Sequence, residues 1–414
     1  MATGTAATAW RNLWRQRRRT LITSSSIAFA ILFATVLTGI GDATYSEMID
    51  LAARMGTGHV AIQHPEYLDT PTLSRSVTGT DALLGLALAD PGVDKAVQRI
   101  AGNVMLASAS KSTGAGFIAF DPEVEDVTTL SLLESVVEGG LFSAQGRPGI
   151  IVGVDLAESL GGGIGRRVIL TLTDKDGEIV QEAVRITGLL RTGAPTPDAG
   201  LALLPLSLLQ STLGYRPDET SQVAVFVGDQ RTSETVAARL DRQLGAGARA
   251  IPWNEVKPDL AGFIAMKLGS TIITEMLILV LVGAGIFNTL FMSVMERLRE
   301  FGVLIALGFT PRRLFSLVMW ESLWLALVGC IAGVLLTAGP YLYLNRVGID
   351  LSGLVDAEAA EISGVTVGMV LRSEIYPENA VLIMVAAVSA TLLAGVYPAW
   401  RAGRVDPVES IRLV

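Results

Sequence analysis

Four charged residues stand close together between apolar stretches of the chain, and their spacing favours a binding surface over a catalytic centre. They are Glu296, Arg297, Arg299 and Glu300, and Gly302 follows them. The neighbouring apolar residues keep a helical spacing, so we expect the charges on a short amphipathic helix. Such a helix can be an interfacial anchor with a solvated charge run or a docking element, and the residues alone leave both interpretations open.

The sequence lacks the residue patterns of common catalytic sites. A phosphate-binding loop needs GxxxxGK[ST] between a strand and a helix, but the chain has no Gly-Lys dipeptide. The glycine-rich stretch 161–165 follows a predicted helix and precedes a predicted strand, so a helix cap and turn is the better interpretation. GxSxG and HExxH are also missing. We therefore expect no catalytic residues and no cofactor on this chain.

Metal and nucleic-acid binding find little support. His59 and His64 are the only histidines, and Cys330 is the only cysteine. The two histidines do not fit one helix face, so we interpret them as surface or hinge residues and not as zinc ligands. One cysteine leaves the compartment open, and a net charge of -8 provides no basic face for nucleic acid.

Half of the 414 residues are hydrophobic and the mean hydropathy is +0.49, which is too apolar for an ordinary soluble protein. Four apolar runs have about the length that a bilayer requires. They lie at residues 21–40, 272–294, 317–338 and 380–396. The first run has no convincing cleavage site, so we expect an uncleaved helix and not a signal peptide. The runs divide the chain into residues 1–45, 46–268 and 269–414.

The basic residues predict the orientation. They cluster at residues 11–19, at residues 297–313 and at residues 401–412, and four spans place all three groups on one side. The positive-inside rule makes that side cytoplasmic. Both termini are then inside, and residues from about 42 to 269 are outside.

Small and acidic residues within the spans have two interpretations each. Gly329 and Gly333 form a GxxxG pattern, and Gly283 and Gly285 lie in the second span. These glycines either let helices approach closely or reflect ordinary membrane-helix composition. The acidic Glu275 and Glu321 lie near span ends; we expect both to reach the interface, without a proton pathway.

The outside segment, residues 46–268, reads as a mixed α/β domain. Alternating or continuous apolar residues predict strands, and amphipathic stretches with turn residues at their ends predict helices. Strands are expected at 58–62, 149–152, 168–173, 179–190 and 222–227, and helices at 81–89, 155–160, 205–213 and 232–244. Asp176 and Gly177 predict a hairpin turn. The expected fold is thus four transmembrane helices with an α/β domain between the first two.

Residues 288–308 (NTLFMSVMERLREFGVLIALG) resemble the signature of the FtsX-like permease family of ABC transporters. Three other segments agree with that resemblance. They are the amphipathic stretch 9–21, the segment 151–161 (IVGVDLAESLG) and the segment 397–412 (YPAWRAGRVDPVESIR), which contains Pro398, Arg401, Asp406 and Pro407. The resemblance covers nearly the whole chain and implies a MacB-like periplasmic core domain.

In that family the short helix docks on a separate ATPase subunit. The resemblance therefore implies that Glu296, Arg297, Arg299 and Glu300 make polar docking contacts and that Gly302 permits close approach. ATP and magnesium would be bound by an ATPase dimer, and this chain would pair with a second permease, identical or paralogous, in the cell inner membrane.

The cargo is less defined. Residues 58–67 look most like the lipoprotein-releasing (LolC/LolE-type) permeases, which implies extraction of a lipoprotein or lipid and a periplasmic acceptor. The alternatives are export of a peptide or drug, and mechanical signalling to a cell-wall hydrolase without transport. The sequence assigns no cargo-binding residues.

Overall fold

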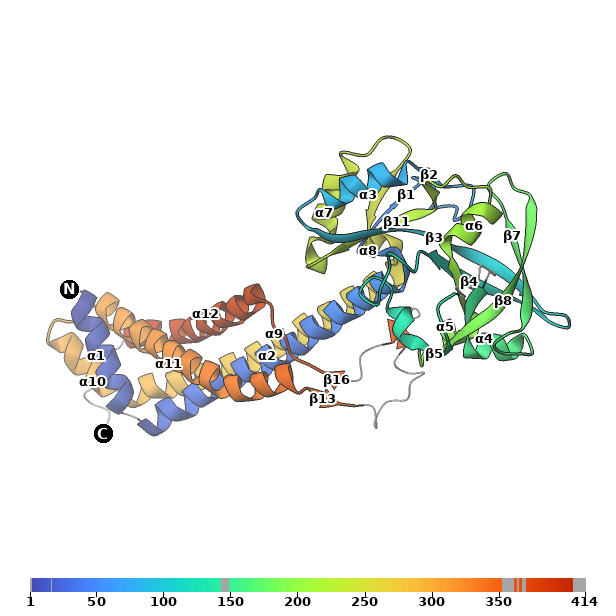
Figure 1. Cartoon of the computed structure of the whole chain (residues 1–414). Helices are drawn as coiled ribbons and strands as arrows, with labels where there is room; N and C mark the ends of the chain where they lie inside the picture. Colours follow the sequence, from blue (N-terminus) through green and yellow to red (C-terminus); the bar gives the residue numbers. More distant parts are fainter. Residues whose placement is uncertain are drawn as a thin grey trace. The chain divides into compact units, whose positions relative to one another are not determined.

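The computed structural model describes residues 2–15, 17–142, 149–351, 361–362, 365–366 and 370–404 (Figure 1). Its internal contacts divide the chain into two compact units. The first comprises Met1–Thr44, Ala265–Asp350 and Val370–Val414. The second comprises Tyr45–Ile264 and Leu351–Met369.

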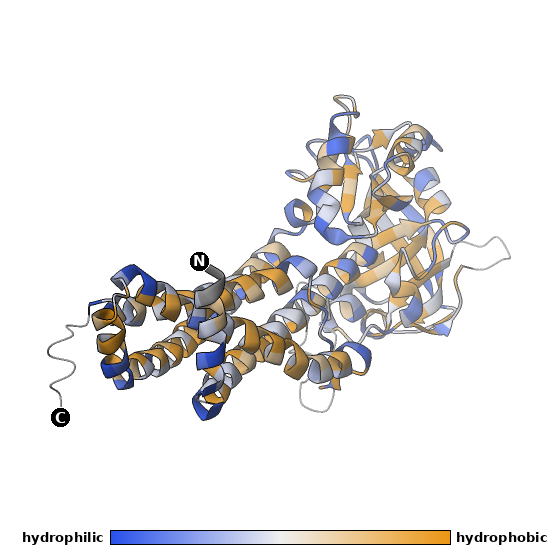
Figure 2. Ribbon diagram, turned by 90° about the vertical axis from the view of Figure 1, so that its left-hand side faces the viewer, coloured by the Kyte–Doolittle hydropathy of each residue, from blue (hydrophilic) through white to orange (hydrophobic). Residues whose placement is uncertain are grey.

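The first unit is helical. Its helices are α1 (Ala2–Arg15), α2 (Arg17–Ala52), α9 (Pro258–Glu296), α10 (Leu298–Ala306), α11 (Pro311–Arg346) and α12 (Pro377–Ala402), with the short strands β13 (Ile349–Asp350) and β16 (Val370–Leu371); α2 and α9 continue into the second unit. Apolar residues cover much of the long helices (Figure 2). Within the described residues, four helices are long and apolar enough to cross a membrane, namely Arg17–Thr57, α9, α11 and α12. The four predicted spans are confirmed, and the helices extend beyond the apolar runs.

Close packing of α11 on α2 depends on two of the four glycines noted in the sequence. A Cβ atom at Gly329 would lie 2.8 Å from side-chain atoms of Ile27, and one at Gly333 would lie 2.9 Å from Ile31. Any larger residue would therefore push the helices apart. Cβ atoms at Gly283 and Gly285 would meet open space among the described residues.

Polar contacts join α2 to its neighbours far from Arg17. Asp42 accepts hydrogen bonds from the Tyr376 amide at 3.1 Å and from Asn379 Nδ2 at 2.8 Å, which ties α2 to the start of α12. Thr38 donates its hydroxyl hydrogen to Glu275 on α9. A carboxylate in an apolar helix is thus given a hydrogen-bond partner, as its desolvation requires.

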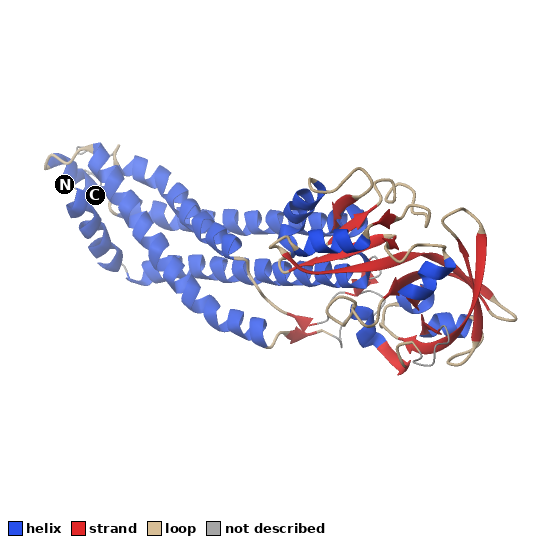
Figure 3. Ribbon diagram, turned by 45° about the horizontal axis from the view of Figure 1, so that its top comes forward, coloured by secondary structure: helices blue, strands red, loops and turns tan. Residues whose placement is uncertain are grey.

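The second unit contains strands and short helices (Figure 3). The strands are β1 (Val60–Gln63), β2 (Val77–Thr78), β3 (Val93–Ala107), β4 (Ser112–Phe120), β5 (Val136–Gly139), β6 (Gly149–Gly153), β7 (Arg167–Thr173), β8 (Ile179–Leu190), β9 (Leu201–Pro205), β10 (Glu219–Thr220), β11 (Gln222–Val227), β12 (Arg249–Pro252), β14 (Glu361–Ile362) and β15 (Val365–Thr366). The helices are α3 (Thr80–Leu88), α4 (Val154–Ser159), α5 (Pro195–Gly200), α6 (Leu206–Thr212), α7 (Ser233–Asp241) and α8 (Trp253–Val256).

Ten of the described strands form one sheet in the order β12-β1-β11-β3-β4-β9-β6-β8-β5, and β7 pairs with β3 and β8. Most pairs are antiparallel, while β4–β9 and β6–β8 are parallel. Strand β11 is buried along its whole length because it lies inside the sheet and carries alternating β-branched residues. The mixed α/β fold that the sequence predicts is confirmed.

Two large apolar cores lie in this unit, beside smaller clusters. One lies between β1, β11 and β12 and the helices α3 and α7, and includes Val225, Val236 and Leu240. The larger one gathers residues of β3, β4 and β6–β9 with α4 and α6, and includes Phe117, Ile186 and Leu209. Large aliphatic and aromatic side chains in both cores supply most of the favourable burial free energy.

A π-helical turn, Ala53–Thr57, follows α2 and is held by a buried arginine. Arg99 Nη1 donates to the Gly56 carbonyl at 2.6 Å, and its other nitrogens bind both oxygens of Glu125 and the Thr129 carbonyl. Gly58 closes the turn at φ 73°, where a Cβ would lie 2.7 Å from the Val225 backbone, so only glycine fits.

The position of His59 differs from the prediction. We expected a surface or hinge histidine, but His59 is buried, and its Nδ1 accepts a hydrogen bond from the Val227 amide at 3.3 Å. Nε2 lies 2.8 Å from Asp50 Oδ1. The backbone donor at Nδ1 assigns the proton to Nε2, so His59 ties β11 to the end of α2.

The predicted strands and helices of this unit agree closely with β1, β6–β8, β11, α3, α4, α6 and α7. Glycine-rich 161–165 forms the predicted cap and turn, since α4 ends at Ser159 and Gly161 has φ 78°. Asp176 and Gly177 form the predicted turn between the antiparallel β7 and β8. The long hairpin of β3 and β4 was not predicted.

Candidate functional site

The charged residues Glu296, Arg297, Arg299 and Glu300 lie where helix α9 ends and α10 begins. Glu296 is the last residue of α9, and Arg297 breaks the helix with φ −102° and ψ 12°. The Arg297 carbonyl then accepts the first hydrogen bond of α10 from the Phe301 amide at 3.0 Å. The break therefore separates a membrane-length helix from a nine-residue helix that carries Arg299, Glu300 and Gly302.

Arg297 faces the helix bundle and is largely buried. Its Nη1 lies 3.0 Å from each oxygen of Glu321 on α11, its Nε donates to Glu300 at 3.2 Å, and its guanidinium stands 5.0 Å from the centre of the Phe301 ring. Burial lowers the pKa of Arg297, but the charges and hydrogen bonds of Glu321 and Glu300 outweigh this effect and raise it. Asn12 on α1 donates to the same Glu321 at 2.8 Å. Three helices, α1, α10 and α11, therefore meet at one carboxylate.

A second arginine fixes the end of α9. Arg19 Nη1 donates to Glu296 at 3.2 Å, and Nη2 donates to the Thr289 carbonyl at 2.6 Å. Arg15 stands 3.8 Å from Glu300, at the long end of an ion pair. The segment before the first span thus contacts both charged groups that flank the helix break.

The inner face of α10 belongs to one apolar cluster with the C-terminal motif. The cluster contains Val294, Phe301, Leu314, Val318, Ala399 and Ala402. Pro398 and Gly302 are buried, and Arg401 is exposed. Asp406 and Pro407 lie outside the described residues. The structure thus brings two predicted motifs together that are about 100 residues apart in the sequence.

The outer face of α10 combines charged and apolar side chains. Arg299, Glu300 and Val303 are exposed, and Leu307, just after the helix, is 75% exposed. These residues recur at helical spacing and lie beyond the end of the α9 span. Exposed apolar residues next to charged ones are typical of a protein-binding surface.

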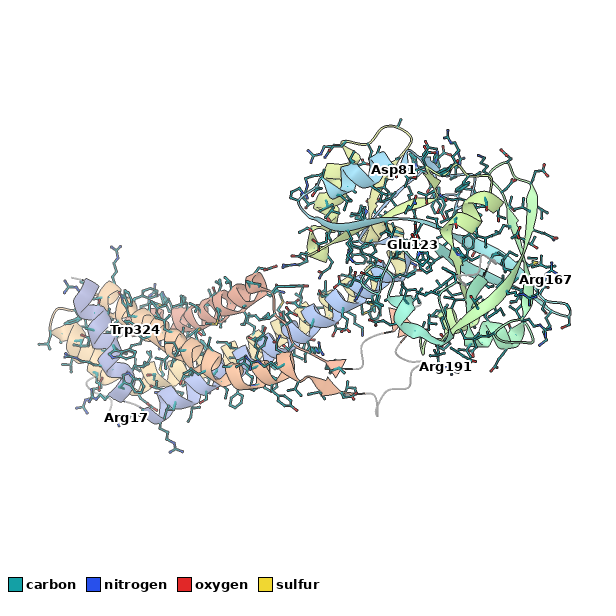
Figure 4. The ribbon with its side chains drawn as sticks, viewed as in Figure 1. Arg17, Asp81, Glu123, Arg167, Arg191 and Trp324 are labelled. Carbon is teal, nitrogen blue, oxygen red and sulfur yellow. The ribbon has the colours of Figure 1, made fainter. Side chains whose placement is uncertain are left out.

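Three residues of this site were not assigned from the sequence. Glu321 was expected to reach the interface, but it is bound by Arg297 and Asn12. The sequence feature that could have indicated this is a carboxylate within an apolar run, because such a carboxylate needs a polar partner. Asn12 and Arg19 had no such signal, because polar residues before a span are common. Trp324 on α11 donates its ring N–H to the Ala6 carbonyl at 3.1 Å and fixes α1 on the same side (Figure 4).

Comparisons with known proteins identify the family. Residues 20–243 match the model of the MacB-like periplasmic core domain, and residues 272–407 match that of the FtsX-like permease C-terminal region. The lipoprotein-releasing system transmembrane protein LolE of Haemophilus influenzae is 25% identical over 70% of each chain. LolC of Xylella fastidiosa is 25% identical over 80% of each chain.

Longer and structural relatives were also found. The macrolide export ATP-binding/permease protein MacB of Nitrobacter winogradskyi is 24% identical over 95% of this chain and 58% of its own. The extracellular domain of the transporter YknZ from Gram-positive bacteria covers 46% of this chain and 98% of its own, at 16% identity and a TM-score of 0.33. The two family matches together span both units, and the first covers more than half of the sequence. The chain therefore belongs to the FtsX-like, MacB-type permeases of ABC transporters.

Proposed function

We propose that this permease couples ATP hydrolysis on a separate cytoplasmic ATPase dimer to the release of lipoproteins or lipids from the membrane. One observation carries the coupling part of the proposal. Helix α10 is fixed on its inner face by Glu321 and by the apolar cluster, while its outer face exposes Arg299, Val303 and Leu307. A helix held on one side and bare on the other is suited to transmit a partner's movement.

The predicted docking residues then differ in their roles, and Glu296 is bound by Arg19 within this chain. Arg299 and Glu300 are exposed and would contact the ATPase together with Leu307. Arg297 would act through α10, because Glu321 and Glu300 occupy its guanidinium. Gly302 is buried and would serve packing within this chain more than contact with the partner.

The orientation follows from charge. The residues around α10 and those of the α1–α2 junction include Arg15, Arg17, Arg18, Arg312 and Arg313, and such clusters are retained in the cytoplasm. The MacB-like domain would then be periplasmic. ATP and magnesium would bind the partner, which agrees with the ATP-binding part named in the longer MacB relative.

Lipoprotein release is the first candidate for the activity of the transporter. Relatives named for lipoprotein release match 70–80% of both chains, a larger share of the relative than the 58% of the MacB relative. The MacB relative, which matches 95% of this chain, supports macrolide or peptide export as the second candidate. A second permease, identical or paralogous, would complete the transporter in either case.

The docking proposal is tested by purifying the full-length chain from its native membrane and quantifying the companion ATPase by mass spectrometry. We expect Leu307→Asp to abolish co-purification, because it places a charge in the docking surface. The matched control is Leu88→Asp, an exposed leucine on α3 of the other unit. If Leu307→Asp retains the ATPase at the level of the control, α10 does not dock there.

The cargo is tested by photo-crosslinking from exposed positions of the MacB-like domain, such as Val124 and Val137. Lipoprotein release predicts adducts with acylated proteins that change when ATP is added. Adducts with an outer-membrane channel or its adaptor, and none with acylated proteins, would favour the exporter.

A further inference from the structure

A groove of about 620 Å³ lies where the start of α2 meets the end of α9. Arg15, Arg17, Arg18 and Arg19 line one part of it, and Ile22, Met292 and Glu296 line the rest together with polar residues of α9. The groove therefore combines guanidinium groups with the apolar side chains of two membrane spans.

The charges of the groove are only partly neutralised. Arg19 is bound by Glu296 and by the Thr289 carbonyl, and Arg15 stands 3.8 Å from Glu300. Arg17 and Arg18 are exposed and have no ion-pair partner within the part of the chain that the structure describes. Arg17 is the first residue of α2 (Figure 4). Two guanidinium groups are thus available to an anion, and such groups favour the oxygens of phosphate.

The apolar part of the groove determines what kind of anion fits. Ile22 is 58% exposed and lies one turn inside α2 from Arg18, and Met292 is exposed on the facing part of α9. Trp10 and Trp14 are exposed on neighbouring α1, and tryptophan is typical of the bilayer interface. An amphiphile could therefore place its anionic head on the arginines and its chains along Ile22 and Met292.

We propose that this groove binds an anionic phospholipid, with the headgroup phosphate on Arg17 and Arg18. Ile22 and Met292 lie within the apolar runs 21–40 and 272–294 of two candidate spans, where acyl chains of the surrounding lipid can contact them. The proposed ATPase contact centres on Arg299 and Val303 of α10 and on Leu307 just after it, none of which lines the groove, although Glu296 and Arg15 bring the two surfaces side by side. Binding of lipid would hold the junction between α1 and α2 against the end of α9. The proposal does not depend on which cargo is moved.

The test is native mass spectrometry of the full-length chain in detergent, titrated with phosphatidylglycerol, phosphatidylcholine and inorganic phosphate. We expect retention of phosphatidylglycerol alone. Arg17→Gln combined with Arg18→Gln should weaken it about 30-fold, since each basic residue near an anionic lipid contributes roughly a factor of five or more. The charge-matched control, Arg11→Gln with Arg312→Gln, removes exposed arginines outside the groove and should leave retention unchanged.

Several results would overturn the proposal. If the Arg17/Arg18 variant and the parent retained phosphatidylglycerol equally, the two arginines would not bind the lipid. An equal loss in the control would indicate general electrostatic attraction. Competition by inorganic phosphate as strong as by lipid would indicate a simple anion site. If the Arg17/Arg18 variant lost the companion ATPase but still retained lipid, the groove would be a protein interface. Melting temperatures equal to that of the parent show that the variants remain folded.

Discussion

Arg99 in the MacB-like unit and Arg297 beside α10 are both held by a carboxylate, but only Arg99 is sealed from solvent. The side chains of Arg99 and Glu125 are 0% and 1% exposed, whereas those of Arg297 and Glu321 are 15% and 12% exposed. Arg99 also donates to two backbone carbonyls. Arg297 divides its hydrogen bonds between Glu321 and Glu300.

This difference in exposure makes the Arg99 contacts rigid and allows the Arg297 contacts to rearrange. The acceptors Glu125 and the Thr129 carbonyl are buried, so movement of Arg99 would leave charges unpaired at a cost of several kcal/mol. Arg297 can exchange Glu300 for water, because Glu300 is half-exposed. We infer that the π-helical turn after α2 moves with its sheet as one body, while α10 can adjust when a partner binds.

The largest effect is expected at Arg99. Arg99→Met leaves Glu125 charged and buried, so the MacB-like unit should lose about 3–5 kcal/mol of stability. Hydrogen exchange of the full-length chain measures this loss unit by unit. Adding Glu125→Leu should recover most of it, because no unpaired charge remains. A single variant as stable as the parent would show that the pair is not sealed.

A smaller effect is expected at Arg297. Arg297→Met removes charged hydrogen bonds from a carboxylate that keeps Asn12 and some water, so we expect a loss of about 1.5–3 kcal/mol in the helical unit. Co-purification with the ATPase should fall as α10 loses its orientation. Arg299→Met is the control for stability and should leave thermal unfolding unchanged. The proposed division of roles fails if Arg299→Met destabilises the chain as much as Arg297→Met.

The Arg239–Asp90 ion pair has one partly exposed and one buried partner, at 35% and 5% exposure, and it predicts a dependence of stability on pH. Hydrogen bonds from Arg239, at 2.7 and 2.6 Å, lower the pKa of Asp90. A carboxylate with a lowered folded-state pKa contributes stability above its unfolded pKa of about 3.9, and this contribution is lost as the pH falls through the folded value. The difference in melting temperature between the parent and Asp90→Asn should therefore shrink from pH 7 to pH 3. A constant difference would assign Asp90 a purely structural role.

The smallest effect is expected at the surface. Hydrogen bonds from Thr128 and then Lys95 lower the pKa of Asp126 to about 2, but both partners of the Lys95–Asp126 pair are exposed. Lys95→Ala should change the free energy of unfolding by less than about 0.5 kcal/mol. Denaturant unfolding of the two proteins provides the comparison, and a loss equal to that at Arg297 would break the link between exposure and effect.

The sequence predicted elements well where the signal is local. The four spans depend on the length of apolar runs, and β7, β8 and their turn depend on alternation and on Gly177. Arg99 could not be found this way, because an arginine in an alternating strand reads as an exposed position. Its partner Glu125 lies in a loop beyond the next strand, and only the sheet brings the two together.

The candidate site was predicted in part for the same reason. The charged residues 296–300 and the C-terminal motif were recognised as segments, but their common apolar cluster and the pairing of Arg297 with Glu321 are contacts between distant parts of the chain. The docking contacts of Glu296, Arg299 and Glu300 remain predictions, because they concern a second protein.

The contact between α2 and α11 has a mechanical consequence. Ile27 and Ile31 fit against Gly329 and Gly333, so sliding of one helix along the other would drive these isoleucines onto larger side chains. The contact therefore locks the two helices in register, and α2 and α11 can shift across the membrane only together.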